Sequence, residues 1–362
     1  MLHSANRTAF DYLGYKFLDR KIESTDEPAA VMTQVLDSCY VLYLSSTDDE
    51  WWGWAAARSE AAYLVAPTPA EKRVLDTIRW VIRRYKIDRN RVYLSGISMG
   101  GCGALAIGLP HGDIFAAIMV DVPAGTEYAA FRMGFPPPLP AGATEAEKTI
   151  WAKRISGAGL PDPPVVLDFS AQNDTWSQTQ PALLQAALGG KLPLIVAWAP
   201  FGHTAFSTPI AKYHEDEVAL SFPWLEIRRN AAYPVFTNAS SDRRSPWVGS
   251  STSVDESGQI NAYFRWSNRR DEPSKFSMRL WVARPVMSNP PDHIPEASTT
   301  DVTFRRLQLF KVEQGKSYAW RLVRGGKILA SGRVAPDPGN LLTIPRLELT
   351  STPAELSLKP AM

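Results

Sequence analysis

A glycine-flanked serine, Ser98, lies between a run of strand-forming residues and a run of helix-forming residues. The residues read Val92-Tyr93-Leu94-Ser95-Gly96-Ile97-Ser98-Met99-Gly100-Gly101, and an apolar stretch from Cys102 to Ile107 follows. Glycines two positions before and after Ser98 allow the backbone to turn sharply without side-chain clashes. The pattern predicts a strand, a tight turn and a helix, with the hydroxyl of Ser98 presented at the sheet edge as a nucleophile.

The surroundings of this short pattern decide its interpretation, because Gly-x-Ser-x-Gly also arises by chance. A strand is expected at Arg91 to Ser95, and an amphipathic helix is expected before it at Pro69 to Tyr85. This context favours a nucleophile elbow over a glycine-rich turn that carries an incidental serine.

Strand and helix patterns alternate before residue 230, and the helical pattern disappears after it. The strands expected first are Tyr40 to Leu44, Ala61 to Ala66, Arg91 to Ser95, Phe115 to Asp121, Val165 to Phe169 and Leu192 to Ala197. Those expected later are Gln259 to Trp266, Lys275 to Val282, Val302 to Phe310, Ser317 to Val323, Lys327 to Val334 and Leu341 to Leu349. We therefore predict an α/β domain with a mostly parallel sheet at 1–230, ending in a helix near 224–229, and an all-β, Ig-like β-sandwich at 231–362.

The composition is that of an ordinary globular protein, with 45% hydrophobic and 21% charged residues. A net charge of +2, from 39 basic and 37 acidic residues, gives no indication of nucleic acid or another polyanionic partner. No apolar run is long enough to cross a bilayer, so no membrane partner is expected. Residues 1–25 lack the apolar segment of a secretory signal. The only cysteines, Cys39 and Cys102, lie in or beside apolar runs and are predicted to be buried thiols.

A serine nucleophile needs a base, and the chain has five histidines. His203 is preferred because it follows the last alternating strand, in the turn Pro200-Phe201-Gly202-His203-Thr204. His214, on the helix that is expected next, is the alternative. Of the other three, His3 is expected in a frayed terminus, His111 in a solvated loop and His293 in a proline-rich segment.

The base needs an acid to orient it, and chain order places that acid between the serine and the histidine. Asp174 fits best, because it lies in a polar loop just after the strand Val165 to Phe169. Asp121 is the substitute, whereas Asp168 lies inside the strand and is expected to be buried. Asp174 also has a simpler interpretation as a turn-forming Asx residue.

A longer segment around the elbow resembles a known family. Arg84-Tyr85-Lys86-Ile87-Asp88-Arg89-Asn90-Arg91-Val92-Tyr93, the elbow itself and Asp113-Ile114-Phe115-Ala116-Ala117 are similar to the bacterial α/β-hydrolase esterases grouped with acetylxylan and feruloyl esterases and polyhydroxybutyrate depolymerases. The resemblance covers about residues 35–230. It implies an α/β-hydrolase fold, a triad at Ser98, Asp174 and His203, and a secreted or periplasmic protein.

The expected reaction is acyl transfer from an ester to Ser98 and then to water. The amide of Met99 is expected to hold the oxyanion together with the amide of Ser46 or Thr47. This second donor is open, because Ser45-Ser46-Thr47-Asp48 stands where the family often has a His-Gly pair. No metal or organic cofactor is expected, since the chain has no His-Glu-x-x-His and no paired Cys-x-x-Cys motif.

Four tryptophans are candidates for substrate binding because they flank the expected oxyanion and acid positions: Trp51, Trp52, Trp54 and Trp176. Their flat rings would suit a sugar or an aromatic acyl group, and ordinary core packing is the competing interpretation. Together with the resemblance, they suggest acetyl or feruloyl esters of plant polysaccharide as substrates. Residues 122–163, with the run Phe135-Pro136-Pro137-Pro138-Leu139-Pro140, are a candidate lid.

Two other function classes remain open. The β-rich domain contains four tryptophans that would serve either a carbohydrate-binding surface or a sandwich core: Trp247, Trp266, Trp281 and Trp320. A polysaccharide-binding protein with an inactive hydrolase domain is therefore the non-enzyme alternative. Among enzymes the alternative is a serine peptidase of prolyl-oligopeptidase type, although such peptidases normally carry a propeller for which this chain has no room.

Overall fold

The computed structural model describes residues 1–5, 8–9, 40–47, 50–53, 67–126, 129, 144–145, 160–200, 202–203, 222–243, 247, 257–283 and 295–361. The chain divides into two compact units. The first unit comprises Met1–Leu192, Val196–Arg229 and Ser245–Ser257, and the second comprises Pro193–Ile195, Asn230–Arg244 and Gly258–Met362. Several predictions fall outside the described residues: the strand at 61–66, most of the candidate lid, Cys39, Trp54, His214 and His293.

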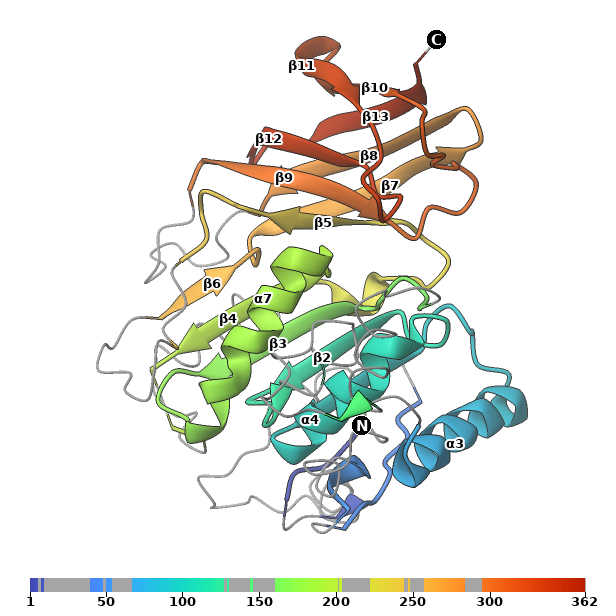
Figure 1. Ribbon diagram of the computed structural model, residues 1–362, viewed down its shortest axis with the longest axis vertical. Coiled ribbons are helices and arrows are strands. Elements are labelled where there is room, and N and C mark those ends of the chain that lie inside the picture. Colours follow the sequence, from blue (N-terminus) through green and yellow to red (C-terminus); the bar gives the residue numbers. More distant parts are fainter. Residues whose placement is uncertain are drawn as a thin grey trace. The chain divides into compact units, whose positions relative to one another are not determined.

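A mostly parallel sheet forms the core of the α/β part of the chain (Figure 1). Four neighbouring strands follow the order of the sequence: β1 (Tyr93–Ile97), β2 (Ala117–Asp121), β3 (Val165–Ala171) and β4 (Leu194–Ala199). β1 pairs with β2 and β2 with β3 in parallel, and every residue of β2, β3 and β4 is buried. Continuous apolar runs are what strands covered on both faces require, so the predicted α/β fold class is confirmed.

The helices of this part are α3 (Pro69–Tyr85), α4 (Met99–Gly108) and α7 (Gln180–Gly190). The predicted helix at Pro69 to Tyr85 is confirmed, and its ends have local causes. The hydroxyl of Thr68 accepts the amide of Glu71 at 3.1 Å, and Lys86 ends the helix in the left-handed conformation with φ 54°. α4 packs against β1 and β2, and all ten of its residues are buried.

Short 3-10 helices connect these elements: η1 (Trp51–Gly53), η4 (Leu109–His111), η5 (Thr175–Thr179) and η7 (Trp224–Glu226). η7 stands at the position where a helix end near 224–229 was predicted. The predicted strand Tyr40 to Leu44 is wrong: only Leu44 forms a bridge, and its partner is Leu2. In the described part of the chain, no helix is both long and apolar enough to span a bilayer.

The second unit contains two antiparallel sheets. One has the order β11-β10-β13-β8-β7 and the other the order β12-β9-β5. The strands are β5 (Tyr233–Thr237), β7 (Phe264–Glu272), β8 (Lys275–Val282), β9 (Ala297–Arg305), β10 (Tyr318–Arg324), β11 (Lys327–Val334), β12 (Thr343–Thr350) and β13 (Ala354–Pro360). A short strand β6 (Gly258–Ile260) precedes β7 and belongs to the sheet of β1 to β4, next to β4.

Aromatic pairs join the two sheets of the second unit into a sandwich. Phe276 of β8 meets Phe304 of β9 edge-on with ring centroids 4.8 Å apart, and Phe236 of β5 stacks on Phe264 of β7 at 4.4 Å. Two antiparallel sheets with an aromatic core between them are typical of β-sandwiches, and the predicted all-β character of this part is confirmed.

Several strand predictions in this unit are wrong for identifiable reasons. The run Gln259 to Trp266 is two strands, because Asn261 takes the left-handed conformation with φ 60° between them. The run Val302 to Phe310 ends as a strand at Arg305, since Arg306 has φ 58°. β5 and β13 are not among the predicted strands. β5 contains Pro234, which its position at the edge of its sheet permits.

Candidate active site

Ser98 occupies the turn between β1 and α4 with a backbone conformation that residues other than glycine rarely adopt. Its φ is 54° and its ψ is −117°. Its amide donates to the carbonyl of Asp121 at 2.9 Å, and its carbonyl accepts the amide of Cys102 at 3.0 Å. The sheet and the first turn of α4 thereby hold the serine in a conformation that is costly in isolation.

The glycines around Ser98 are required by close backbone contacts. A Cβ atom on Gly96 would lie 2.1 Å from the carbonyl oxygen of Gly100, and one on Gly100 would lie 2.1 Å from that of Leu2. Real Cβ atoms do not approach backbone so closely, so neither position accepts a side chain without a shift of the main chain. The predicted strand, turn and helix are present at this point.

A chain of two short hydrogen bonds joins Ser98, His203 and Asp174. The hydroxyl Oγ of Ser98 lies 2.7 Å from Nε2 of His203, and Nδ1 of the same ring lies 2.6 Å from Oδ2 of Asp174. The Asp174 side chain is 1% exposed, whereas the His203 side chain is 29% exposed. With the ring proton on Nδ1, the imidazole donates to the carboxylate and accepts from the serine hydroxyl.

Asp174 has a second partner that fixes its orientation. It follows β3 and caps η5, and its Oδ1 accepts the amide of Trp176 at 2.9 Å. The turn-forming interpretation and the interpretation as a partner of histidine therefore describe one residue, which uses one carboxylate oxygen for each. Because the cap holds Oδ1, only Oδ2 points to His203.

The two alternative carboxylates, Asp168 and Asp121, do not contact His203. Asp168 is buried inside β3, where it accepts hydrogen bonds from Ser170 Oγ at 2.6 Å and Gln180 Nε2 at 2.8 Å, and burial raises its pKa to about 6. Asp121 ends β2 and is also buried, with its backbone carbonyl on the amide of Ser98.

Two histidines have surroundings that the sequence did not indicate. His111 is not a solvated loop residue, because its Nε2 lies 3.0 Å from Oε1 of the fully buried Glu71. His3 is not frayed either: it is 2% exposed, and its ring meets Trp52 edge-on with centroids 5.1 Å apart. Leu2, which bridges Leu44 and Gly96, anchors this segment beside the elbow.

The backbone amides predicted to bind the oxyanion differ in their hydrogen bonding. Met99 is the first residue of α4, where a helix amide has no partner within the helix. The amide of Ser46 donates to Nε2 of His3 at 2.9 Å and is thus already committed. The amide of Thr47, the other alternative for the second donor, forms no hydrogen bond with a described residue.

The segment that carries Ser46 and Thr47 is held by several side chains. The hydroxyl of Ser46 donates to Oε2 of Glu50 at 2.8 Å and accepts the amide of Trp52 at 3.2 Å. Arg73 of α3 donates to both carboxylate oxygens of Glu50, and this hydrogen bonding lowers the pKa of Glu50. The segment is therefore fixed to α3 by a bidentate ion pair.

The tryptophans predicted to bind substrate differ in burial and in their contacts. Trp52 is a packing residue: it is fully buried, it lies against Gly103 of α4, and its indole nitrogen donates to the carbonyl of His3 at 3.1 Å. Trp51 and Trp176 lie together with ring centroids 5.4 Å apart, and Trp176 is 40% exposed. Trp176, the exposed member of this aromatic pair, lies two residues after Asp174.

Within the described ranges, no cluster of three or more histidine, cysteine or acidic side chains is arranged to hold a metal ion. Cys102 is a buried thiol, as predicted, and its Sγ donates to the carbonyl of Gly125 at 3.8 Å. Trp247 packs against Trp198 at a centroid distance of 5.5 Å and belongs to the first unit, whereas Trp266, Trp281 and Trp320 are half-buried in the sandwich.

No protein-family model and no curated protein matches the chain by sequence. Solved structures give distant likenesses. The chain is similar to FphF, a fluorophosphonate-binding serine hydrolase of Staphylococcus aureus, with 13% identity and a TM-score of 0.37 over 62% of this chain and 81% of that one.

Two further structures are similar to shorter parts of the chain. S-formylglutathione hydrolase FrmB of Staphylococcus aureus has 15% identity and a TM-score of 0.31, over 50% of this chain and 66% of that one. A carboxylesterase of Bacillus cereus has 14% identity and a TM-score of 0.27 over 40% of this chain, which spans 57% of that esterase.

Proposed function

We propose that this chain is a serine esterase that hydrolyses carboxylic esters through a covalent acyl-enzyme. The observation that carries the proposal is the hydrogen-bonded chain of Ser98, His203 and Asp174, with spacings of 2.7 and 2.6 Å. A strained serine between a strand and a helix, a partly exposed imidazole and a buried carboxylate are the parts that nucleophilic acyl transfer requires.

In the first half-reaction, Ser98 Oγ attacks the ester carbonyl carbon while its proton passes to Nε2 of His203. The new carbon–oxygen bond converts the carbonyl into a tetrahedral oxyanion. Collapse of this intermediate expels the alcohol, which takes the proton back from Nε2. Asp174 keeps the ring proton on Nδ1 and stabilises the imidazolium that forms in between.

The oxyanion is held by backbone amides in this proposal. The amide of Met99 lies at the start of α4, where the helix dipole also favours negative charge. The amide of Thr47 is the second donor, since that of Ser46 is bound to His3. The Glu50–Arg73 pair and the Ser46 hydroxyl support the position of Thr47.

In the second half-reaction, His203 takes a proton from water, and the resulting hydroxide attacks the acyl carbon. The acid leaves as Ser98 Oγ recovers its proton, so each turnover consumes one water and one ester. None of these steps uses a metal or an organic cofactor.

The substrates that we propose are acetyl or feruloyl esters of plant polysaccharide. Support comes from the sequence resemblance described above and from the pair of Trp51 and Trp176, of which Trp176 is accessible and adjoins the Asp174 turn. A flat indole offers an apolar face to an aromatic acyl group or a sugar ring.

The test is a hydrolysis screen with p-nitrophenyl esters of increasing chain length, methyl ferulate and acetylated xylan. We expect turnover of short esters by the wild-type chain and at most trace turnover by Ser98→Ala. Trp176→Ala should reduce kcat/KM for methyl ferulate about tenfold relative to p-nitrophenyl acetate, by loss of aromatic contact. Trp80→Ala, which removes an exposed indole of α3, is the matched control and should change neither value.

Three results would overturn the proposal. Cleavage of peptide amides without ester turnover would make the chain a peptidase. Polysaccharide binding with no hydrolysis of any ester would make it a binding protein. Equal losses in Trp176→Ala and Trp80→Ala would remove the tryptophan pair from substrate recognition.

A further inference from the structure

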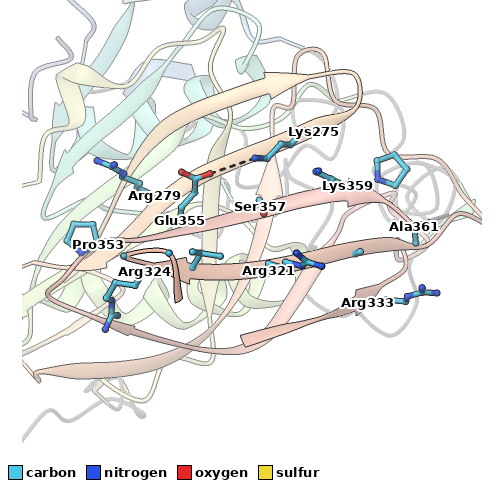
Figure 2. A pocket seen from close by; sticks show the side chains of 15 residues that line it. Lys275, Arg279, Arg321, Arg324, Arg333, Pro353, Glu355, Ser357, Lys359 and Ala361 are labelled. Atoms are coloured by element: carbon cyan, nitrogen blue, oxygen red, sulfur yellow. Dashed lines mark ion pairs between the residues drawn. The ribbon is translucent and has the colours of Figure 1, made fainter. Parts of the chain in front are cut away.

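One side of the sheet β11-β10-β13-β8-β7 carries an unusual concentration of positive charge (Figure 2). The apolar residues Phe276, Met278, Leu280, Leu356 and Leu358 alternate along β8 and β13 and are buried on the core side. The residues between them face the other side. We call this side the cationic face. It contains six basic residues: Lys275, Arg279, Arg321, Arg324, Arg333 and Lys359.

The strand register brings these residues together from distant parts of the sequence. Ala319 of β10 stands opposite Lys359 of β13 on one side and Arg333 of β11 on the other. Two residues further along β10, Arg321 stands opposite Ser357. Neighbouring strands lie about 4.8 Å apart and alternate residues about 7 Å apart, so these cations surround a floor of small side chains.

The positive charge of the cationic face is almost uncompensated. Its lining includes one carboxylate, Glu355, which lies 4.0 Å from Lys275. Arg279, Arg321, Arg333 and Lys359 form no ion pair with any described residue. Elsewhere on the surface, by contrast, Arg73 and Arg228 each have an acidic partner at 2.8 Å.

One arginine of the cationic face also has a buried nitrogen without a hydrogen-bond acceptor. Nε of Arg324 is buried and has no hydrogen-bond partner in the described structure. A buried N–H that lacks an acceptor is costly, and a bound anion would supply one. The groove that contains this residue encloses about 870 Å³, which is enough for several units of a polymer.

The make-up of the lining distinguishes among anionic polymers. It contains no aromatic side chain, whereas proteins that bind single-stranded nucleic acid stack bases on aromatic rings. It also contains no large apolar side chain that could enter a membrane. The lining does contain guanidinium groups, whose planar arrangement of N–H donors matches a carboxylate, and the hydroxyl of Ser357.

We infer that the cationic face binds an acidic polysaccharide whose sugars carry carboxylates. Arginine and lysine side chains would pair with uronate carboxylates along an extended chain, while Ala319 and Ser357 leave room for the sugar rings. This inference concerns a surface of the second unit, and it does not depend on the proposed esterase activity.

The test is binding of the full chain to polygalacturonate, measured by titration calorimetry at low and moderate salt. The same polymer with its carboxylates methyl-esterified is the neutral control. We expect binding to the acid form alone, weakening as salt rises. The double variant Arg321→Gln/Arg333→Gln should bind the acid polymer about tenfold more weakly or worse, because each substitution removes a guanidinium group that donates charge-assisted hydrogen bonds.

A charge-matched variant, Lys311→Gln/Arg346→Gln, removes two exposed cations outside the groove and should bind as the wild type does. Turnover of p-nitrophenyl acetate by the Arg321/Arg333 variant should be unchanged, so a failure here is distinguishable from a failure of the esterase proposal. Equal weakening in both double variants, equal binding of the esterified polymer, or tighter binding to single-stranded DNA or anionic lipid vesicles would overturn the inference.

Discussion

The backbone amide of Ser46 donates a hydrogen bond to Nε2 of His3, 43 residues earlier in the chain, at a distance of 2.9 Å. Nδ1 of the same ring faces the carbonyl of Ser4 at 2.8 Å, which fixes the ring proton on Nδ1. In the proposed mechanism His3 is therefore a positioning residue, because it holds the segment whose Thr47 amide would donate to the oxyanion.

His3→Ala should therefore lower kcat for short esters about tenfold with little change in KM, because the oxyanion donors act mainly in the transition state. His3→Gln retains an acceptor and should recover much of the loss. The measurement is steady-state kinetics together with a thermal melt. Proportional losses of kcat and melting temperature in both variants, with no recovery by glutamine, would assign His3 a purely structural role.

Asp174→Asn provides a second prediction, which follows from the cap on η5. The asparagine oxygen would keep the hydrogen bond to the amide of Trp176, so the NH2 group would face His203. That group cannot accept from Nδ1, so it selects the tautomer with its proton on Nε2, which cannot accept from Ser98. We expect kcat to fall by about 10³ to 10⁴.

Asp168→Asn is the matched control for this prediction. Asp168 is a buried carboxylate of β3, the strand that precedes Asp174. It accepts hydrogen bonds from Ser170 and Gln180 and not from a histidine. The substitution should alter the melting temperature and leave kcat within a few-fold of wild type. The reverse ranking of the two variants would remove Asp174 from the site.

Local signals in the sequence sufficed for some features and not for others. The limits of α3 follow from Thr68, Pro69 and an amphipathic stripe, and the elbow follows from its glycines, because each interaction lies within a few residues. The bond between His3 and Ser46 has no local signal. Neither residue type nor spacing distinguishes this histidine from one in a frayed terminus.

The same limit applies to the cationic face. The net charge of +2 suggested no polyanionic partner, because an average over the chain hides a cluster. Arg279, Arg321, Arg333 and Lys359 lie on four different strands and become neighbours only through the strand register. Predicting that face would have required the pairing of β10 with β11 and β13.

Asp242 gives a prediction about stability. Burial raises its pKa from 3.8 to about 7 in the folded chain, where its Oδ1 accepts the amide of Asn261 at 2.8 Å. Between these pH values the folded state holds a proton that the unfolded state has lost, so the free energy of unfolding should fall as pH rises from about 4 to about 7. Asp242→Asn keeps an acceptor for Asn261 and removes the titration.

The measurement is the melting temperature of both proteins at intervals from pH 4 to pH 8. We expect the difference between Asp242→Asn and wild type to grow in favour of the variant across that window. Asp168, with a pKa raised to about 6, acts in the same direction in both proteins and cancels in the difference. A constant difference across the window would contradict the assignment.

Covalent labelling can show whether Ser98 is the nucleophile. The full chain is treated with a fluorophosphonate, which reacts with serines activated by a neighbouring base, and the adduct is located by peptide mass mapping. We expect one adduct per chain on Ser98, loss of esterase activity in proportion to labelling, and no adduct in Ser98→Ala or Asp174→Asn under the same conditions. Labelling at another residue with loss of activity, or full activity in a chain labelled at Ser98, would show that Ser98 is not the nucleophile.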